Sequence, residues 1–413
     1  MPKYSIVIPS RNGGRYLHAC VESIVSQKYQ DYELIISDDH STDGTDEYLN
    51  SLNSENITVI RPPQTMCMSE HWDWALSNAS GEWLIFVGQD DGLQPHFFPL
   101  ADRLTGLADN KHIRAIMSER AYYFWPGCEA IYGDIAARSF VRNKTKICNS
   151  RVELAKALFG IQNYFQLPEM YTTSLFRRSL IEEARSKQNG ALITTHPQDA
   201  NLAVIACSLE THYLKSFIPL GWVGTSLKSA GMAVSTIVNN ENKGKIEDLK
   251  RDYENKIKKS SLPYNALAGD FAVGIDSIYL WQVLLQTERL HSSLFNRVIR
   301  SWIFKFILFG IALPKLRLKK SSFHKRLLLF KNMLDANDMS FVPVAIFSWL
   351  VDAFVLLYKV IYLIFRIPRK IFRLIIFKPV KIMVTYRQRP GFTMADASAM
   401  MLEKMEKAGW ELI

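Results

Sequence analysis

The chain has 413 residues, a net charge of +10 and a hydrophobic fraction of 48%. This length exceeds what one hydrophobic core usually supports, so we expect one full-sized domain followed by a second region. With 22% charged residues, the composition excludes a disordered chain. The excess of 50 Lys and Arg over 40 Asp and Glu leaves three kinds of partner open: nucleic acid, an anionic membrane or anionic substrates.

The five cysteines are scattered, odd in number and free of Cys-x-x-Cys spacing. This pattern argues against a disulfide framework and a zinc site, and it favours a reducing compartment. The first residues run directly into a strand-like segment, without a basic and then apolar stretch ahead of a cleavage site. We therefore expect the N-terminal half to stay in the cytosol.

Short apolar runs alternate with segments of helical periodicity in the first part of the chain. The expected strands are 4–9, 33–37, 57–60, 83–87 and 113–118. The expected helices are 15–27, 42–52 and 69–78, the last of them capped by Ser69. This alternation predicts an α/β fold in which right-handed crossovers place helices on both faces of a mostly parallel sheet.

Polar loops follow three of the expected strands at their carboxyl ends. They are Pro9-Ser10-Arg11-Asn12, Asp38-Asp39 and Gly88-Gln89-Asp90-Asp91. In open sheets of this kind, ligands bind in the crevice beyond the carboxyl ends of the strands. We therefore expect the three loops to converge on one rim.

Two pairs of adjacent acids stand in these loops. A divalent cation with oxygen ligands could be bridged by Asp90 and Asp91 to a phosphate. Alternatively, this pair caps the helix that begins near Pro95, and one acid of Asp38-Asp39 caps the helix that follows it. Two acidic loops at neighbouring strand ends would repel each other unless a cation lies between them, which favours a bound metal with a nucleotide.

Two stretches of the sequence resemble family 2 glycosyltransferases of the GT-A fold. They read YSIVIPSRN at 4–12 and SDDHSTDGT at 37–45. The run SIVSQ at 23–27 is similar to the family's first helix, and GEWLIFV at 81–87 to the strand before its Asp-x-Asp region. The resemblance covers about the first half of the chain. It implies an inverting transfer from a nucleoside diphosphate sugar, of UDP type, to a hydroxyl of a glycan or lipid-linked acceptor.

The resemblance also implies roles for individual residues at the donor site. Asp39 would accept a hydrogen bond from the nucleotide base, while Pro9 and Arg11 would line the nucleoside pocket. Asp90 would hold Mg²⁺ or Mn²⁺, and Asp91 would support it. The donor-binding residues expected in full are Pro9, Ser10, Arg11, Asp38, Asp39, Gln89 and Asp90.

The chain departs from the family's Asp-x-Asp-Asp pattern at one position. Gly88 stands where the first Asp is expected, so one carboxylate contact to the metal or the donor ribose is missing. Gln89 can replace a ribose hydrogen bond but not a charge.

A direct displacement at the anomeric carbon needs a general base on the acceptor side, and a carboxylate suits this role. The run TTHPQD at 194–199 resembles the family segment that carries this acid ahead of a helix, here 200–209. Asp199 is therefore the candidate base, with an N-cap of that helix as the alternative. We expect His196 to be structural. The run 221–229 is similar to the segment that closes the donor site in related enzymes.

The remainder of the chain is more basic and more helical in pattern. We expect three parts: the GT-A catalytic domain at 1–235, a helical region at 236–340 and an apolar, basic helical tail at 341–413. The stretch 341–365 could span a bilayer, but Asp352 and Lys359 interrupt it. Basic residues interleaved with apolar ones follow, at Arg366, Arg369, Lys370, Arg373, Lys378, Lys381, Arg387 and Arg389.

This basic run suits a helix that lies in the interface of an anionic leaflet, which predicts a protein peripheral to the inner face of the cell membrane. The alternative is that the tail packs on the catalytic domain or in an oligomer. No nucleic-acid motif accompanies the run, so we expect no nucleic acid partner.

Two other functions stay open beside sugar transfer. One is a non-catalytic nucleotide-sugar-binding module at the membrane, in which Gly88 reflects lost chemistry. The other is a nucleotidyltransferase, which should carry a glycine-rich, basic loop after the first strand; residues 10–15 only partly suggest one.

Overall fold

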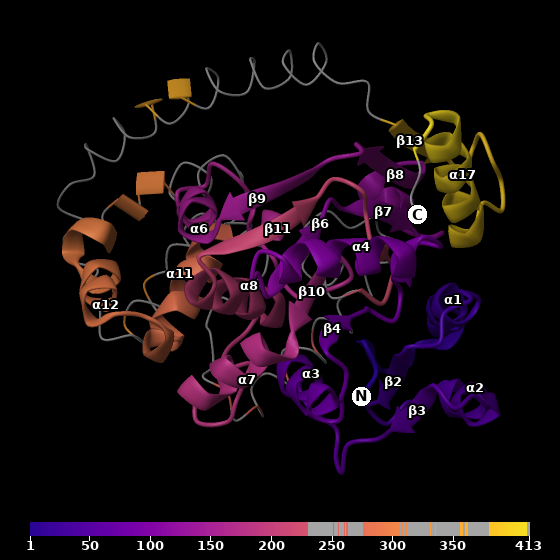
Figure 1. Ribbon diagram of the computed structural model, residues 1–413, viewed down its shortest axis with the longest axis horizontal. Coiled ribbons are helices and arrows are strands. Elements are labelled where there is room, and N and C mark those ends of the chain that lie inside the picture. The colour runs from indigo at the N-terminus through magenta and orange to yellow at the C-terminus, as the bar shows by residue number, and fades with distance from the viewer. Residues whose placement is uncertain are drawn as a thin grey trace.

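The structure is a computed structural model that describes residues 1–229, 276–305 and 380–410, together with isolated positions between 251 and 361. Its described part is an α/β fold with two sheets (Figure 1). The predicted boundary near residue 235 and the tail from 341 to 379 lie outside these ranges, apart from a few isolated positions.

The larger sheet has eight strands in the order β3-β2-β1-β4-β10-β6-β11-β9 within the described ranges. Their bounds are β1 Tyr4–Ser10, β2 Tyr32–Asp38, β3 Ile57–Ile60, β4 Trp83–Phe86, β6 Ala115–Ser118, β9 Thr145–Asn149, β10 Ser174–Arg177 and β11 His212–Ser216. Strand β10 runs antiparallel to both neighbours, and β9 runs antiparallel to β11. The other strands share one direction, so the predicted fold class is confirmed, as a mixed sheet with a parallel majority.

Helices cover both faces of this sheet, and the alternation of side chains along β1 explains how. Ile6 and Ile8 belong to a core cluster with α1 (Gly14–Val25) and α4 (Phe97–Asp109). Val7 points to the other face, into a cluster with α3 (Met68–Ser77), α7 (Arg178–Lys187) and α8 (Gln198–Leu209). Because both faces are covered, every residue of β1 is buried, as expected for an interior strand of such a sheet.

Two helix starts differ from the prediction. Helix α2 (Thr45–Ser51) begins after Gly44, whose φ of 82° is incompatible with a continuing helix. Helix α3 begins at Met68 with Cys67 at the N-cap, so Ser69 is not the cap. The Ser69 hydroxyl instead pairs with Nδ1 of the buried His196 at 2.6 Å, which joins α3 to the start of α8.

A second sheet, of five strands in the described residues, has the order β13-β8-β7-β12-β5. The bounds are β5 Gly92–Leu93, β7 Ala121–Phe124, β8 Ile135–Val141, β12 Gly221–Thr225 and β13 Val380–Thr385, with the short helix α5 (Glu129–Tyr132) between β7 and β8. Strands β12 and β5 pair directly after the Asp90-Asp91 loop. The second sheet therefore forms one side of the predicted rim.

The C-terminal segment belongs to this sheet, which corrects part of the tail prediction. Residues around Lys381 were expected in a basic helix, but β13 pairs antiparallel with β8 along its length. Ile382 and Val384 point into the core while Lys381 and Met383 are exposed, so the period is that of a strand. The apolar alternation decides the structure here, because it can be buried against β8.

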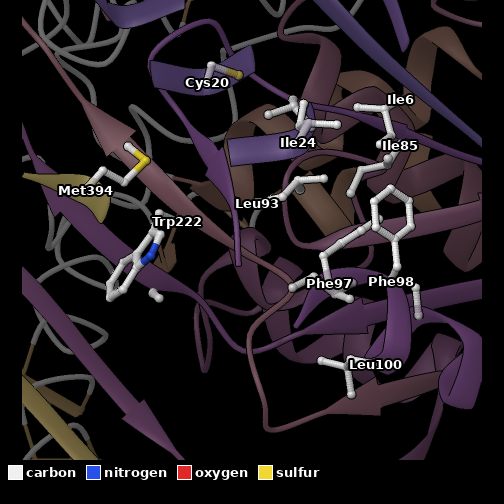
Figure 2. Close-up of a cluster of buried hydrophobic side chains, with 14 of the residues drawn as sticks. Ile6, Cys20, Ile24, Ile85, Leu93, Phe97, Phe98, Leu100, Trp222 and Met394 are labelled. Carbon is white, nitrogen blue, oxygen red and sulfur yellow. The ribbon is translucent and has the colours of Figure 1, made fainter. Parts of the chain in front are cut away.

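Helix α17 (Met394–Lys407) follows β13 and packs on the α/β core formed by the first 229 residues (Figure 1). Thr393 and Asp396 form a capping box that fixes its start. Figure 2 shows Met394 near Trp222 of β12 within one buried cluster, and the Trp222 indole donates to the Ser398 hydroxyl at 2.9 Å. Packing on the N-terminal α/β part of the chain, one of the alternatives left open, is thus found for residues 380–410.

A third cluster joins the middle of the chain to the helix that carries Asp199. It brings α6 (Ser150–Leu158), the turn η1 (Tyr164–Gln166), α8, α11 (Asp276–Gln286) and α12 (Ser293–Arg300) together, with η4 (Glu288–Leu290) between the last two. No helix in the described ranges is both long enough and apolar enough to cross a bilayer.

Candidate active site

The loops after β1, β2 and β4 meet, as the parallel order of these strands requires. Gln89 Oε1 accepts hydrogen bonds from the Ser10 hydroxyl and the Arg11 backbone N–H, each at 2.9 Å. The Asp39 backbone N–H donates to the Ser10 carbonyl at 2.8 Å. The predicted convergence of the three loops is therefore present. Gln89 links its own loop to the loop after β1 through these hydrogen bonds.

Asp39 lies buried at this rim beside Arg11. Its Oδ1 accepts the Met66 backbone N–H at 3.0 Å, and its Oδ2 is 3.5 Å from Arg11 Nη1. Burial raises the pKa of Asp39 to about 6, although the Met66 N–H and the Arg11 charge oppose the rise. The carboxyl group can therefore titrate near neutral pH and can accept a hydrogen bond when ionised.

Asp38, unlike Asp39, has both carboxylate oxygens engaged in contacts within the protein. Oδ2 forms an ion pair with Arg61 at 2.7 Å, and the Ser41 hydroxyl and backbone N–H both donate to the carboxylate. These contacts fix the loop between β2 and α2, but neither Asp38 nor Asp39 caps α2, whose N-cap is Gly44 without a side-chain hydrogen bond, so the capping alternative is wrong.

Asp90 is held by the loop that follows β12. Its Oδ2 accepts hydrogen bonds from the hydroxyls of Ser226, at 2.7 Å, and Ser229. Lys228 in the same loop reaches across to the Asn12 carbonyl and to Asp43 Oδ2, the latter at 2.9 Å. Burial raises the pKa of Asp90, and the two serine hydroxyls lower it. The loop 226–229 thus closes over the rim from the C-terminal side of the domain.

Asp91 is fully buried and ties three segments together. Oδ1 accepts the Gly224 N–H at 2.6 Å, while Oδ2 accepts the Gly88 N–H at 3.1 Å and the Thr172 hydroxyl. Burial raises the pKa of Asp91 to about 7, and the neighbouring Asp90 charge adds to the rise. Its oxygens are engaged by protein donors, so its evident role is to fix the loop that presents Asp90.

The glycine at position 88 has a local structural cause. A Cβ atom there would overlap the Tyr171 hydroxyl and lie 2.8 Å from Asp91 Oδ2. Tyr171 therefore occupies the space into which a side chain at position 88 would project. Within the described ranges, no three His, Cys, Asp or Glu side chains gather into a metal-binding cluster.

Asp199 stands at the start of α8 but is not its cap. Pro197 holds the N-cap position and Asp199 is the second helical residue, so the N-cap alternative is wrong. Asp199 Oδ2 accepts the Tyr164 hydroxyl at 2.9 Å, and Oδ1 accepts the Ala200 N–H at 2.8 Å. Burial raises the pKa of Asp199, which suits a group that must take up a proton.

Several residues around these acids were not predicted from the sequence. They are Tyr164, Tyr171 and Thr172, together with the buried ion pair of Arg120 and Glu169, and none belongs to a spaced motif. Ser226 and Ser229 lie in the run 221–229, whose resemblance to a segment that closes the donor site was the signal for them.

Comparison with known proteins finds a likeness to one family over the loops of this site. Residues 5–109 match the model of glycosyl transferase family 2. A PGL/p-HBAD biosynthesis glycosyltransferase of Mycobacterium tuberculosis is 29% identical over an alignment of 176 residues that covers 38% of this chain. Because the match spans 61% of that relative, the chain covers under two thirds of its length.

Two further relatives match shorter stretches. Glycosyltransferase GlyG of Streptococcus pneumoniae is 34% identical over 21% of this chain and 30% of its own. A GalNAc(5)-diNAcBac-PP-undecaprenol beta-1,3-glucosyltransferase of Campylobacter jejuni is 30% identical over 22% of this chain and 31% of its own.

Among solved structures, S. aureus TarS in complex with UDP-GlcNAc matches with a TM-score of 0.42 and 16% identity, over 81% of this chain and 88% of that one. The family match, by contrast, covers the strands and loops that carry Ser10, Asp39 and Asp90. The likeness to glycosyl transferase family 2 thus covers about a quarter of the chain, from residue 5 to residue 109, and includes these loops.

Proposed function

We propose that the protein transfers a sugar from a nucleoside diphosphate sugar to an acceptor hydroxyl, with inversion at the anomeric carbon. The observation that carries the proposal is the meeting of the Ser10, Asp39 and Asp90 loops at the carboxyl ends of β1, β2 and β4. This is the edge at which sheets of this type bind nucleotides. The likeness of the same residues to glycosyl transferase family 2 supports sugar transfer over nucleotidyl transfer.

At the donor end, Asp39 accepts a hydrogen bond from the nucleotide base and Arg11 lies beside it. Pro9 and Ser10, the last two residues of β1, belong to the same donor end of the site. UDP is the donor nucleotide that we propose, because the family resemblance implies it. Lys228 and the serines of its loop lie over the rim, where they can meet the diphosphate.

The single carboxylate of Asp90 can share a divalent cation with the donor phosphates, as proteins usually bind Mg²⁺ in nucleotide sites. Asp90 would hold Mg²⁺ or Mn²⁺, and the cation would neutralise the charge of the departing diphosphate. Asp91 supports this arrangement through the loop geometry, since its oxygens bind Gly88, Thr172 and Gly224.

At the acceptor end, Asp199 serves as the general base. The acceptor oxygen attacks the anomeric carbon from the face opposite the diphosphate, and its proton passes to the Asp199 carboxylate. The new glycosidic bond forms as the bond to the diphosphate breaks, so the configuration inverts. The raised pKa of Asp199 increases its affinity for the proton in the transition state.

The proposed acceptor is a glycan or lipid-linked saccharide at an anionic membrane surface. The Campylobacter relative is named as a glucosyltransferase that acts on an undecaprenol-linked glycan. In this chain, α12 and the residues after it expose Leu294 (65%), Val298 (47%) and Trp302 (63%) beside Arg297 and Arg300. Apolar side chains flanked by cations on one helix suit a bilayer interface of anionic lipids.

Flotation tests the membrane part of this proposal. The full chain should float with vesicles that contain phosphatidylglycerol and not with pure phosphatidylcholine, and Trp302→Glu should reduce the bound fraction. Val59→Glu is the matched control, because Val59 is a similarly exposed apolar residue on the edge strand β3. Full solubility in the presence of anionic vesicles at high and low salt alike would refute the membrane location.

A panel of nucleotide sugars tests the transfer itself, with donor hydrolysis or transfer as the readout. We expect turnover with one donor class, and loss of at least two orders of magnitude for Asp90→Ala. Asp46→Asn, an exposed acid of α2, should leave turnover unchanged. Binding of UDP without turnover of any donor would instead indicate a non-catalytic binding module.

A further inference from the structure

A chain of contacts leads from Asp199 to a buried ion pair. The Tyr164 hydroxyl donates to Asp199 Oδ2 at 2.9 Å, and the Tyr164 ring packs on Phe165 with their centroids 4.2 Å apart. The guanidinium of Arg120 lies 4.3 Å from the centroid of the Phe165 ring. Arg120 Nη2 in turn pairs with Glu169 Oε1. Three segments distant in sequence are thereby joined behind the candidate base.

The ion pair is almost completely withdrawn from water. The Arg120 side chain is 8% exposed and that of Glu169 is fully buried. Within the described ranges, Arg120 Nε and Glu169 Oε2 have no hydrogen-bond partner. A buried pair with unsatisfied atoms is a weak source of stability, since desolvation of both charges offsets their attraction. The ion pair of Arg120 and Glu169 is therefore more significant for its effect on Asp199 than for stability.

The charges around Asp199 define this effect. Burial raises the pKa of Asp199, whereas the Ala200 N–H, the Tyr164 hydroxyl and the Arg120 charge lower it. Burial also raises the pKa of Glu169, an effect that Arg120 opposes and the Asp199 charge reinforces. His196, three residues before Asp199, has its pKa lowered to about 4 by burial and carries no charge at neutral pH. Arg120 is thus a permanent positive charge that lowers the pKa of Asp199 at every working pH.

We propose that Tyr164 and Arg120 are positioning residues for the base: Tyr164 orients the Asp199 carboxylate, and Arg120, anchored by Glu169 and Phe165, places a positive charge behind it. The inference rests on the proposed function, because it takes Asp199 as the acceptor of the hydroxyl proton. Burial favours the neutral form of a carboxylate, so a hydrogen bond and a positive charge near the ionised form favour the state that takes up that proton.

Tyr164→Phe tests the first half of the proposal through a pH profile. Loss of the hydroxyl removes a hydrogen bond to the charged form, so the acidic limb of kcat/KM for the acceptor should move to higher pH. We expect a shift of about one pH unit, equivalent to about 1.4 kcal/mol. Above the limb, the rate should recover to within a few-fold of wild type, and the donor KM should not change.

Tyr213→Phe is the matched control for this variant. The Tyr213 hydroxyl donates to the Gln166 carbonyl of the same η1 turn at 3.3 Å, and the structure gives it no contact with Asp199. A general disturbance of η1 would therefore affect both variants alike, whereas loss of the base contact moves the acidic limb in Tyr164→Phe alone.

Arg120 needs a paired substitution, because its removal alone would leave a buried carboxylate without its partner. The double variant Arg120→Met, Glu169→Gln removes both charges and should fold, with its acidic limb moved to higher pH. Arg120→Lys keeps the positive charge but not the planar guanidinium. Its acidic limb should therefore lie between those of wild type and the double variant. Circular dichroism and UDP binding provide the check that each variant is folded.

The outcomes separate this inference from the proposed function. If wild type transfers sugar and Asp199→Asn does not, but the limb stays in place in both Tyr164→Phe and the double variant, the positioning role is wrong. If Asp199→Asn retains transfer, the base assignment itself fails. A limb that moves in Tyr164→Phe and the double variant, and not in Tyr213→Phe, supports the inference.

Discussion

The most specific structural prediction concerns Gly88, the position at which the chain lacks the family's first Asp. Gly88→Ala should destabilise the protein, because the added Cβ overlaps the Tyr171 hydroxyl and lies 2.8 Å from Asp91 Oδ2. Overpacking of this kind costs about 1–3 kcal/mol. Gly88→Asp should cost more, since it adds a charge beside the buried Asp91.

A double-mutant cycle tests the steric cause directly. Tyr171→Phe removes the clashing hydroxyl, so Gly88→Ala should cost less in that background than in wild type, with a coupling of about 0.5–3 kcal/mol. Urea unfolding followed by fluorescence gives the four free energies of unfolding, and an unchanged slope makes the midpoints comparable. Strict additivity, or a neutral Gly88→Ala, would refute the argument that Tyr171 fills this space.

Three further predictions concern the rim and the C-terminal helix. Because the Asp39 pKa is raised from 3.8 to about 6, its contribution to stability falls as pH rises between about 4 and 6; Asp39→Asn should flatten that part of the pH–stability curve, by up to about 3 kcal/mol. Ser226→Ala with Ser229→Ala removes two hydrogen bonds that favour ionised Asp90, and should weaken UDP binding by about tenfold in calorimetry, with normal binding counting against the closing loop. Met401→Ala should cost about 2–5 kcal/mol in thermal unfolding, because Met401 is fully buried against the catalytic domain; a change under 1 kcal/mol would contradict that packing.

The sequence was most informative where structure is local. The strand at 4–9 and the helix after it follow from short-range periodicity, and both are found as β1 and α1. The position of β10 between β4 and β6 could not be predicted in this way, because Ser174–Arg177 pairs with strands far earlier in the chain. Pairing of that kind is decided by the packing of the whole sheet.

The same difference between local and long-range structure applies to the candidate site. The Asp39 and Asp90 loops were predictable because each directly follows a strand of the parallel part of the sheet. The hydroxyls that bind Asp90 come from residues 226–229, which reach it only because β12 lies beside the loop. At the C-terminus, the charge of Lys381 and its neighbours obscured an alternation of Ile382 and Val384 that the strand β13 uses.

The central claim is that Asp199 takes the acceptor proton while the donor is held at the Asp39 and Asp90 rim. Single-turnover transfer by Asp199→Asn, measured on protein that is shown by calorimetry to bind UDP normally, tests it most directly. The account predicts a transfer rate at least about a hundredfold below wild type with unchanged UDP affinity. Transfer at the wild-type rate by the folded, UDP-binding variant would contradict it.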